Sequence, residues 1–421
     1  MRKNKWLDGT LTASCIAALL GVAACGGSGT SGEPVVTAVA CMTQPTLDSL
    51  LSADGLSFTR IVSHLSTPAP TYGMLITRYG TDGSPVTVEY MIHDATDPAT
   101  GNIIPGKALL VLIAGGQLTA FIDGIGSTVT NSGGNFLVRS AHLFAAQGYR
   151  VVTIDQPSDA ATVWIPPGNT FGSAMDGYRV SPAHAVDLAR IIDVADPNRG
   201  LPVVLAGTSR GAISSVAQAA LAQAVALSSP VTAGSSAGVY PVGSTQADPA
   251  RVGVPARVVW HVNDGCWAST PAAARALVGQ FASGSGVPVH GGFVNPAAPQ
   301  DVCGAFSYHG FLGIESCAVE QHTSWLDGLA LAKPAGAVPS ITLSSVGGAS
   351  VSFDAGNWVP PGGNVVLPHG ASVHGGSVSL VGALLSYAPP AGLTGTTDSF
   401  VYVVRSADGA LKQGVISVTL S

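Results

Sequence analysis

Charged residues are scarce in this sequence, and the few that occur do not cluster. Asp, Glu, Lys and Arg make up 10% of the 421 residues, whereas about a quarter is usual for globular proteins. The formal net charge is −6 at pH 7. A mildly acidic chain without a Lys/Arg cluster lacks the electrostatic surface that nucleic-acid binding requires. We therefore expect no nucleic-acid partner.

The chain also has few cysteines. None of the six stands in a CxxC pair or at a His/Cys spacing that suggests a metal site. No Asp/Asn cluster shows the spacing of calcium ligands either. The sequence therefore predicts no metal site and no cofactor.

Residues 1–24 have the layout of an export signal, with three basic residues among the first five and an apolar stretch that ends at Ala24. Polar residues interrupt the stretch, which is too short for a convincing membrane-spanning helix. Val22-Ala23-Ala24-Cys25 resembles a bacterial lipobox, which implies that Cys25 carries a lipid anchor. The alternative is a secretory signal cleaved without lipidation. A Gly/Ser-rich tether follows over 25–40.

The expected location is therefore the cell envelope, with the chain held to a membrane by its lipid. The residue after Cys25 is Gly rather than Asp, which resembles an outer-membrane destination in a Gram-negative cell, facing the periplasm or the surface. Export leaves four cysteines in an oxidising compartment, and an even count there favours disulfides. They are Cys41, Cys266, Cys303 and Cys317.

Strand-like and helix-like segments alternate over residues 41–333. Short apolar runs bounded by glycine are typical of buried parallel strands, and the longer segments repeat apolar residues every three or four positions. This alternation predicts a doubly wound, mostly parallel α/β sheet. The expected strands are 86–93, 109–116, 150–155, 201–207 and 256–264, and the expected helices are 136–149, 181–195, 209–227, 269–282 and 319–332.

Residues 338–421 show no helical period. Short alternating runs separated by Gly and Pro predict a small all-β sandwich joined to the rest by a short linker. The stretch 384–421 resembles the last strands of bacterial Ig-like or cadherin-like modules.

The strongest chemical signal is a GxSxG sequence at Gly207–Gly211. A serine on a strained turn between strand and helix is exposed as a nucleophile, and the flanking glycines leave room for that turn. A second copy at Gly234–Gly238 contains Ser236. Only Ser209 follows a buried strand and opens a helical pattern, so we expect Ser209 to be the nucleophile.

A serine nucleophile needs a base and an acid that orients the base. Asp264 ends the strand-like run 256–264, and His309 lies in a loop before the helix-like segment 319–332. The order serine, acid, histidine along the chain is the one expected for this arrangement. The rival acids are more consistent with loop or turn carboxylates: Asp155, Asp159 and Asp301. Three histidines lie in helical patterns and are expected to pack or to face solvent, namely His142, His184 and His322, and His261 is expected in the core. The histidines in glycine-rich stretches are expected to face solvent: His290, His369 and His374.

Acyl transfer also needs N–H donors for the developing oxyanion. The backbone N–H of Arg210, directly after the serine, is one expected donor. The turn Ala114-Gly115-Gly116-Gln117 follows another predicted strand, so the second donor is expected from Gly116 or Gln117. The alternative is that these glycines serve only a tight turn.

With these blocks in order, residues 57–333 resemble the α/β-hydrolase superfamily, and more narrowly a group of bacterial exported hydrolases that share GGNFLVRS, IDQPSD, AGTSRGAIS, HVNDGC and SYHGFLGIE. The resemblance implies a serine hydrolase, which we expect to act on small or polymeric carboxylic esters. The alternatives are an amidase or peptidase with the same triad, or an inert envelope lipoprotein that binds through its C-terminal module. Too few residues precede Asp264 for a helical lid, so we expect an open pocket.

Two further expectations depend on the triad. If Asp264 and His309 meet, their loops lie side by side, which predicts a Cys266–Cys303 disulfide and leaves Cys41 with Cys317. Because residues 338–421 contribute no member of the triad, we expect them to be dispensable for hydrolysis of small soluble esters.

Overall fold

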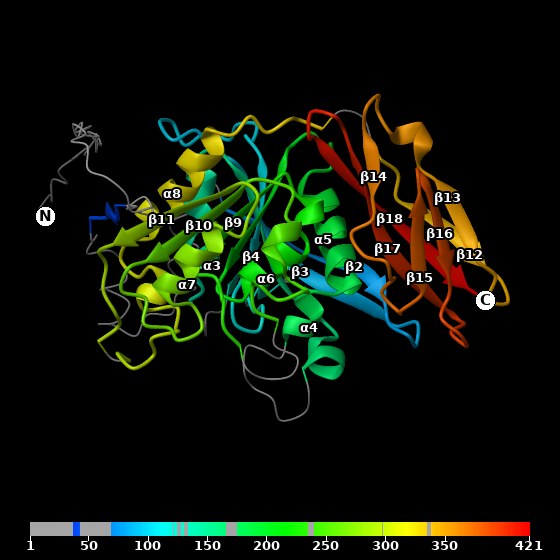
Figure 1. Cartoon of the computed structure of the whole chain (residues 1–421), viewed down its shortest axis with the longest axis horizontal. Coiled ribbons are helices and arrows are strands. Elements are labelled where there is room, and N and C mark those ends of the chain that lie inside the picture. Colours follow the sequence, from blue (N-terminus) through cyan, green and yellow to red (C-terminus); the bar gives the residue numbers. More distant parts are fainter. Residues whose placement is uncertain are drawn as a thin grey trace, which may run out of the picture. The chain divides into compact units, whose positions relative to one another are not determined.

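A nine-stranded sheet forms the centre of the larger part of the chain in the computed structural model (Figure 1). The hairpin at one edge is antiparallel and pairs antiparallel with its inner neighbour, whereas all later pairs in this sheet are parallel. In spatial order the strands are β2 (Thr71–Tyr79), β3 (Pro85–His93), β7 (Arg150–Pro157), β4 (Leu109–Ile113), β8 (Val203–Thr208), β9 (Ala224–Ser228), β10 (Ala256–His261), β11 (Gly284–His290) and β1 (Val39–Ala40).

The predicted signal at 1–24, the predicted lipidation site Cys25 and Ser236 lie outside the described residues. A separate two-stranded ribbon is formed by β5 (Ile122–Asp123) and β6 (Thr128–Val129). The structure describes residues 37–42, 69–120, 122–123, 128–129, 134–165, 175–234, 240–296, 298–334 and 338–421.

Helices cover both faces of the central sheet. In β4, Leu109, Val111 and Ile113 belong to the apolar core that also contains residues of α5, α6 and α7, while Leu110 and Leu112 belong to a second core with residues of α3 and α8. Successive side chains of a strand point to opposite faces, so a strand with both faces covered is apolar throughout. The helices are α3 (Phe136–Ala146), α4 (Asp176–Arg179), α5 (Pro182–Ala195), α6 (Gly211–Ala217), α7 (Pro271–Val278) and α8 (Glu315–Asp327).

This arrangement is the α/β-hydrolase fold, and the fold class predicted from the sequence is confirmed. An antiparallel edge hairpin leads into parallel strands with helices on both faces, and a turn containing Ser209 joins the strand β8 to α6.

Two of the helices begin with the side-chain caps that their sequences predict. Ser181 accepts a hydrogen bond from the N–H of His184 with Pro182 at the first helical position, and Thr270 caps α7 in the same way.

One predicted helix is wrong in its extent. The segment 209–227 was expected to be helical throughout, but α6 ends at Ala217 and residues 224–228 form strand β9. The 3-10 turn Ala219–Leu221 separates the two. Small apolar residues fill the whole segment, so its pattern does not distinguish a buried helix from a buried strand.

The C-terminal part contains two small sheets with an apolar interior of their own. A four-stranded sheet has the order β12 (Ile341–Ser345), β18 (Leu411–Leu420), β17 (Thr396–Arg405) and β14 (Asn364–Val366), and a three-stranded sheet has the order β13 (Val351–Asp354), β16 (Leu384–Ala388) and β15 (Ser377–Val381).

Strand β17 is buried on both faces. Phe400, Tyr402 and Val404 point into the interior between the two small sheets. Val401 and Val403 belong to the core that also contains α5, and β17 lies directly against that helix (Figure 1). The C-terminal sheets therefore share a hydrophobic core with the hydrolase fold.

Polar contacts also join the C-terminal sheets to the hydrolase fold. The Thr396 hydroxyl donates to the carbonyl of Gly80 at 2.7 Å, and the Arg199 guanidinium contacts the carbonyls of Val338 and Gln413. His369, which was expected to face solvent, is instead partly buried, with its Nε2 2.9 Å from the Gln218 side chain. That expectation was wrong because His369 contacts Gln218, the residue directly after α6.

Candidate active site

Ser209 has a backbone conformation that few residues other than glycine adopt. Its φ is +53°, in the left-handed region that is costly for a residue with a side chain. A Cβ on Gly207 would lie 2.3 Å from the carbonyl oxygen of Gly211, and one on Gly211 would lie 2.1 Å from that of Ile113. A side chain at either position would therefore clash with the backbone, and only glycine fits. The turn is the strained strand-to-helix bend that the GxSxG pattern predicts.

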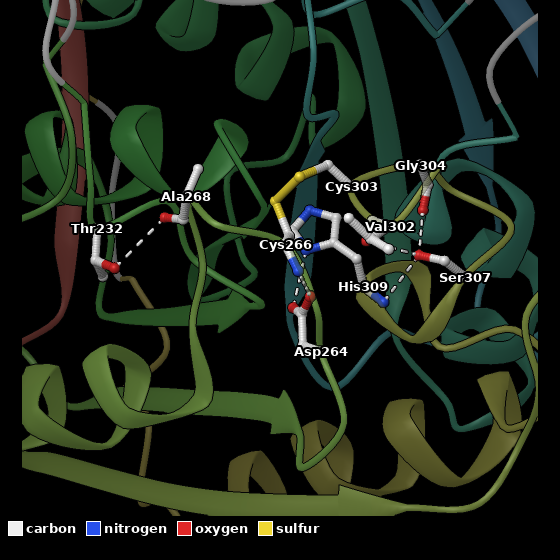
Figure 2. The surroundings of a disulfide bond; sticks show 9 residues. All are labelled: Thr232, Asp264, Cys266, Ala268, Val302, Cys303, Gly304, Ser307 and His309. Carbon is white, nitrogen blue, oxygen red and sulfur yellow. Dashed lines mark hydrogen bonds and ion pairs between the residues drawn. A yellow bond between two sulfur atoms is a disulfide. The ribbon is translucent and has the colours of Figure 1, made fainter. Parts of the chain in front are cut away.

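Asp264 and His309 are brought together by two loops (Figure 2). His309 Nδ1 lies 2.9 Å from Asp264 Oδ2, and both residues are buried. The other carboxylate oxygen of Asp264 accepts the N–H of Cys266 at 2.9 Å. The backbone of His309 is fixed in turn, because its N–H donates to the Ser307 hydroxyl. The imidazole is thus held in a single orientation.

Ser209 and His309 line one pocket of about 160 Å³. The Nε2 atom of His309 is buried and forms no hydrogen bond within the described part of the structure. A histidine with Nδ1 held by a carboxylate and Nε2 left open can accept a proton from a group in the pocket. The other lining residues are Gly115, Gly116, Thr119, Asn135, Phe136, Thr208, Cys303, Ala305 and Gly310.

The turn expected to supply an oxyanion donor lies at the same pocket. Gly116 has a φ of +55° and lines the pocket, with Gln117 directly after it. A Cβ on Gly115 would come within 3.0 Å of the Ser209 side chain, so this turn approaches the serine closely. The N–H groups of Gly116 and Gln117 both remain candidates. Arg210 follows Ser209 and precedes α6.

The described residues form two disulfides. Cys266 is bonded to Cys303 with a Cα–Cα distance of 4.6 Å, and Cys41 is bonded to Cys317. Figure 2 shows the first bond beside Asp264 and His309. It joins the loop that carries the acid to the loop that carries the histidine.

The rival acids and histidines lie elsewhere. Asp159 pairs with Arg78, and His322 Nε2 contacts the Ser228 hydroxyl at 2.9 Å. His261 is stacked on Tyr308, and burial lowers its pKa. None of the rival side chains is among the described residues that line the pocket.

Sequence reasoning missed two buried charged residues next to the pocket, Asp176 and Arg179. Asp176 forms an ion pair with the Arg210 side chain, and Arg179 donates to backbone carbonyls of the turn at Gly116. The available signal was an Asp and an Arg three positions apart in a chain with few charges. Burial of both was not foreseeable from that spacing.

Within the described residues, no three His, Cys, Asp or Glu side chains are grouped so that they could hold a metal ion. In the same part of the chain, no helix combines the length and apolarity that crossing a bilayer would require.

No family model matches the sequence, and neither does any curated protein. Among solved structures, a zinc-bound, cold-adapted esterase from an Arctic intertidal metagenomic library is 16% identical over 54% of this chain and 86% of its own, with a TM-score of 0.35. A peroxisomal α/β-hydrolase from Saccharomyces cerevisiae is 10% identical over 63% and 90%, with a TM-score of 0.38. The acylaminoacyl peptidase of Pyrococcus horikoshii is 11% identical over 64% of this chain but only 43% of its own, with a TM-score of 0.36.

Proposed function

We propose that this protein is a serine hydrolase that cleaves carboxylic esters, with Ser209 as nucleophile, His309 as base and Asp264 as orienting acid. One observation carries the proposal. The buried His309 has Nδ1 held 2.9 Å from Asp264, and its Nε2 has no hydrogen-bond partner among the described residues. It shares its pocket with Ser209, whose φ is left-handed.

The reaction follows from these positions. Ser209 Oγ attacks the ester carbonyl carbon while His309 Nε2 takes the hydroxyl proton. The negative charge passes to the carbonyl oxygen, which accepts hydrogen bonds from the N–H of Arg210 and from that of Gly116 or Gln117. Collapse breaks the bond to the alcohol, which leaves with the proton from His309. A water molecule then repeats the sequence on the acyl-enzyme and releases the acid.

The proposal includes export to the cell envelope and attachment to a membrane through a lipid on Cys25. Two disulfides support an oxidising compartment, since such bonds are rare in reducing ones. Metabolic labelling with a fatty-acid probe should mark the wild-type chain and not Cys25→Ala. Equal labelling of both would remove the anchor from the proposal.

A fluorophosphonate probe tests the catalytic proposal, because it reacts with an activated serine. We expect the wild-type protein to be labelled at Ser209, and Ser209→Ala to lose labelling and ester hydrolysis, by about a millionfold in turnover. Ser236→Ala in the second GxSxG copy is the matched control and should keep both. Unlabelled wild-type protein would contradict the enzyme proposal and favour an inert binding lipoprotein.

The same triad can cleave amides, so the bond type needs its own measurement. Matched ester and anilide substrates with one acyl group, varied in acyl length, separate an esterase from an amidase or peptidase. We expect turnover of the ester series to exceed that of the anilides. A preference for anilides would replace the esterase by the amidase.

A further inference from the structure

We infer that Arg179 is a positioning residue for the oxyanion hole, and that with Asp176 it holds the two segments that supply the N–H donors. The two residues are the ends of the four-residue helix α4. The inference rests on the proposed serine-hydrolase function and adds a role for charged groups that do not touch the substrate.

The Arg179 guanidinium is fully buried, and one of its nitrogens faces the turn beside the serine. Its Nη2 lies 3.0 Å from the carbonyl oxygen of Ala114, 3.4 Å from that of Gly115 and 3.1 Å from that of Gly116. Its Nη1 donates to the Ser214 hydroxyl on α6 at 3.1 Å. One side chain thus joins the turn to the helix that follows the nucleophile.

These contacts fix the direction of the N–H groups. In a trans peptide unit the C=O and N–H bonds lie in one plane and point in opposite directions. The carbonyls of Gly115 and Gly116 point toward Arg179, so the N–H groups of Gly116 and Gln117 point away from it. Both proposed donors belong to peptide units that Arg179 orients. The left-handed φ of Gly116 gives this turn a conformation that needs such support.

The other proposed donor is held from the opposite end of α4. The Arg210 side chain forms an ion pair with Asp176, which is itself fully buried. The same carboxylate oxygen accepts the N–H of Tyr240 at 3.3 Å. The residue after the nucleophile is therefore tied to the same short helix as the turn at Gly116.

The positive charge of Arg179 also strengthens the N–H donors that its contacts orient. Burial lowers the pKa of Arg179 to about 10, so the group remains a cation at neutral pH. A buried cation at the carbonyl end of a peptide unit polarises that unit, which strengthens its N–H as a donor on the far side. Such orientation before the reaction is the main source of oxyanion stabilisation in enzymes.

The test compares Arg179→Met with Arg190→Met, which also removes a guanidinium desolvated by burial. Arg190 donates to the Ser417 hydroxyl on β18 and is not among the described residues that line the pocket. For Arg179→Met we expect kcat for an ester to fall by about a hundredfold or more, as when an oxyanion donor is lost. KM should change by less than about threefold, because the ground-state carbonyl gains little from the hole. Arg190→Met should keep the wild-type kcat.

Phenylboronic acid provides a readout that a structural role alone would not move. It forms a tetrahedral adduct with an activated serine and so places an oxygen in the hole. Its Ki should rise in Arg179→Met by the same factor by which kcat/KM falls. The pH midpoint of kcat/KM, which reports the histidine, should stay at the wild-type value.

Arg179→Lys retains the charge but not the planar fork, so it should lie between wild type and Arg179→Met in both kcat and boronate Ki. An unchanged kcat in Arg179→Met, a loss confined to KM, or a shifted pH midpoint would overturn the inference. Failure of Arg179→Lys to fold would also overturn it, by making Arg179 a residue of folding. Wild-type protein that fluorophosphonate does not label would refute the proposed function instead.

Discussion

At the scale of single residues, Asp264 decides which nitrogen of His309 carries the proton. One carboxylate oxygen accepts the N–H of Cys266 and the other faces Nδ1 of His309. In Asp264→Asn the amide oxygen would remain opposite the Cys266 N–H, which turns the NH₂ group toward Nδ1. The histidine would then carry its proton on Nε2, where it cannot accept one from Ser209.

We therefore expect Asp264→Asn to lower kcat by roughly ten-thousandfold while the protein stays folded. Steady-state kinetics and thermal unfolding of the purified variant measure the two effects. Asp301→Asn, a change of the same chemistry in a rival acid near His309 in sequence, should leave kcat unchanged. A large loss in Asp301→Asn with activity kept in Asp264→Asn would reverse the assignment.

Residues whose role is set by the local chain were predictable at this scale. Gly207 is required by a contact within the turn itself, because a Cβ there would meet the carbonyl of Gly211. Gly211 is required by the close approach of Ile113 on β4, and its place in the GxSxG pattern is what indicates it. Arg179 acts on a turn more than sixty positions earlier in the chain. Nothing in its neighbouring residues specifies that contact, which exists only once α4 has packed against α5 and α6.

At the scale of elements, the Cys266–Cys303 bond joins the two loops that hold the acid and the histidine (Figure 2). We expect Cys266→Ser/Cys303→Ser to lose up to about 4 kcal/mol of stability, the chain-entropy value for a closed loop of this length. Because a displacement of about 1 Å can cost roughly a hundredfold in rate, kcat should also fall by tenfold or more.

The second disulfide is the matched control, because it joins Cys41 to α8 and does not border the pocket. Cys41→Ser/Cys317→Ser should lower the denaturant midpoint while the folded protein keeps its kcat. Equal kcat in both double variants would show that the bond near the acid serves stability alone.

Elements were predictable where periodicity and end signals agree. Helix α5 begins at Pro182 after the Ser181 cap, as its sequence indicates. The strand β11 was missed, because GSGVPVH contains two glycines and a proline and has little strand propensity. Its residues 284–289 pair with β10, so its conformation is imposed by the sheet.

At the scale of the whole molecule, the run Phe400-Val401-Tyr402-Val403-Val404 is informative. A sandwich strand with one face in solvent would alternate apolar and polar residues, whereas this one is apolar on both faces. The sequence therefore indicated that both faces of β17 are buried. Composition favoured a separate module. Only the structure shows that the second face of β17 packs against α5, through Val401 and Val403.

This shared core predicts that residues 338–421 are needed for stability of the hydrolase fold, in contrast to the dispensability expected from the sequence. Val403→Asp would bury an unpaired carboxylate and should cost several kcal/mol. Val381→Asp makes the same change on a side chain that is 76% exposed, and should stay within about 0.5 kcal/mol of wild type. Thermal inactivation of ester hydrolysis measures both, alongside a chain that ends at Lys333, which we expect to aggregate or to inactivate at a much lower temperature. A truncated chain with the inactivation temperature of the full protein would show that the contact with α5 contributes no stability.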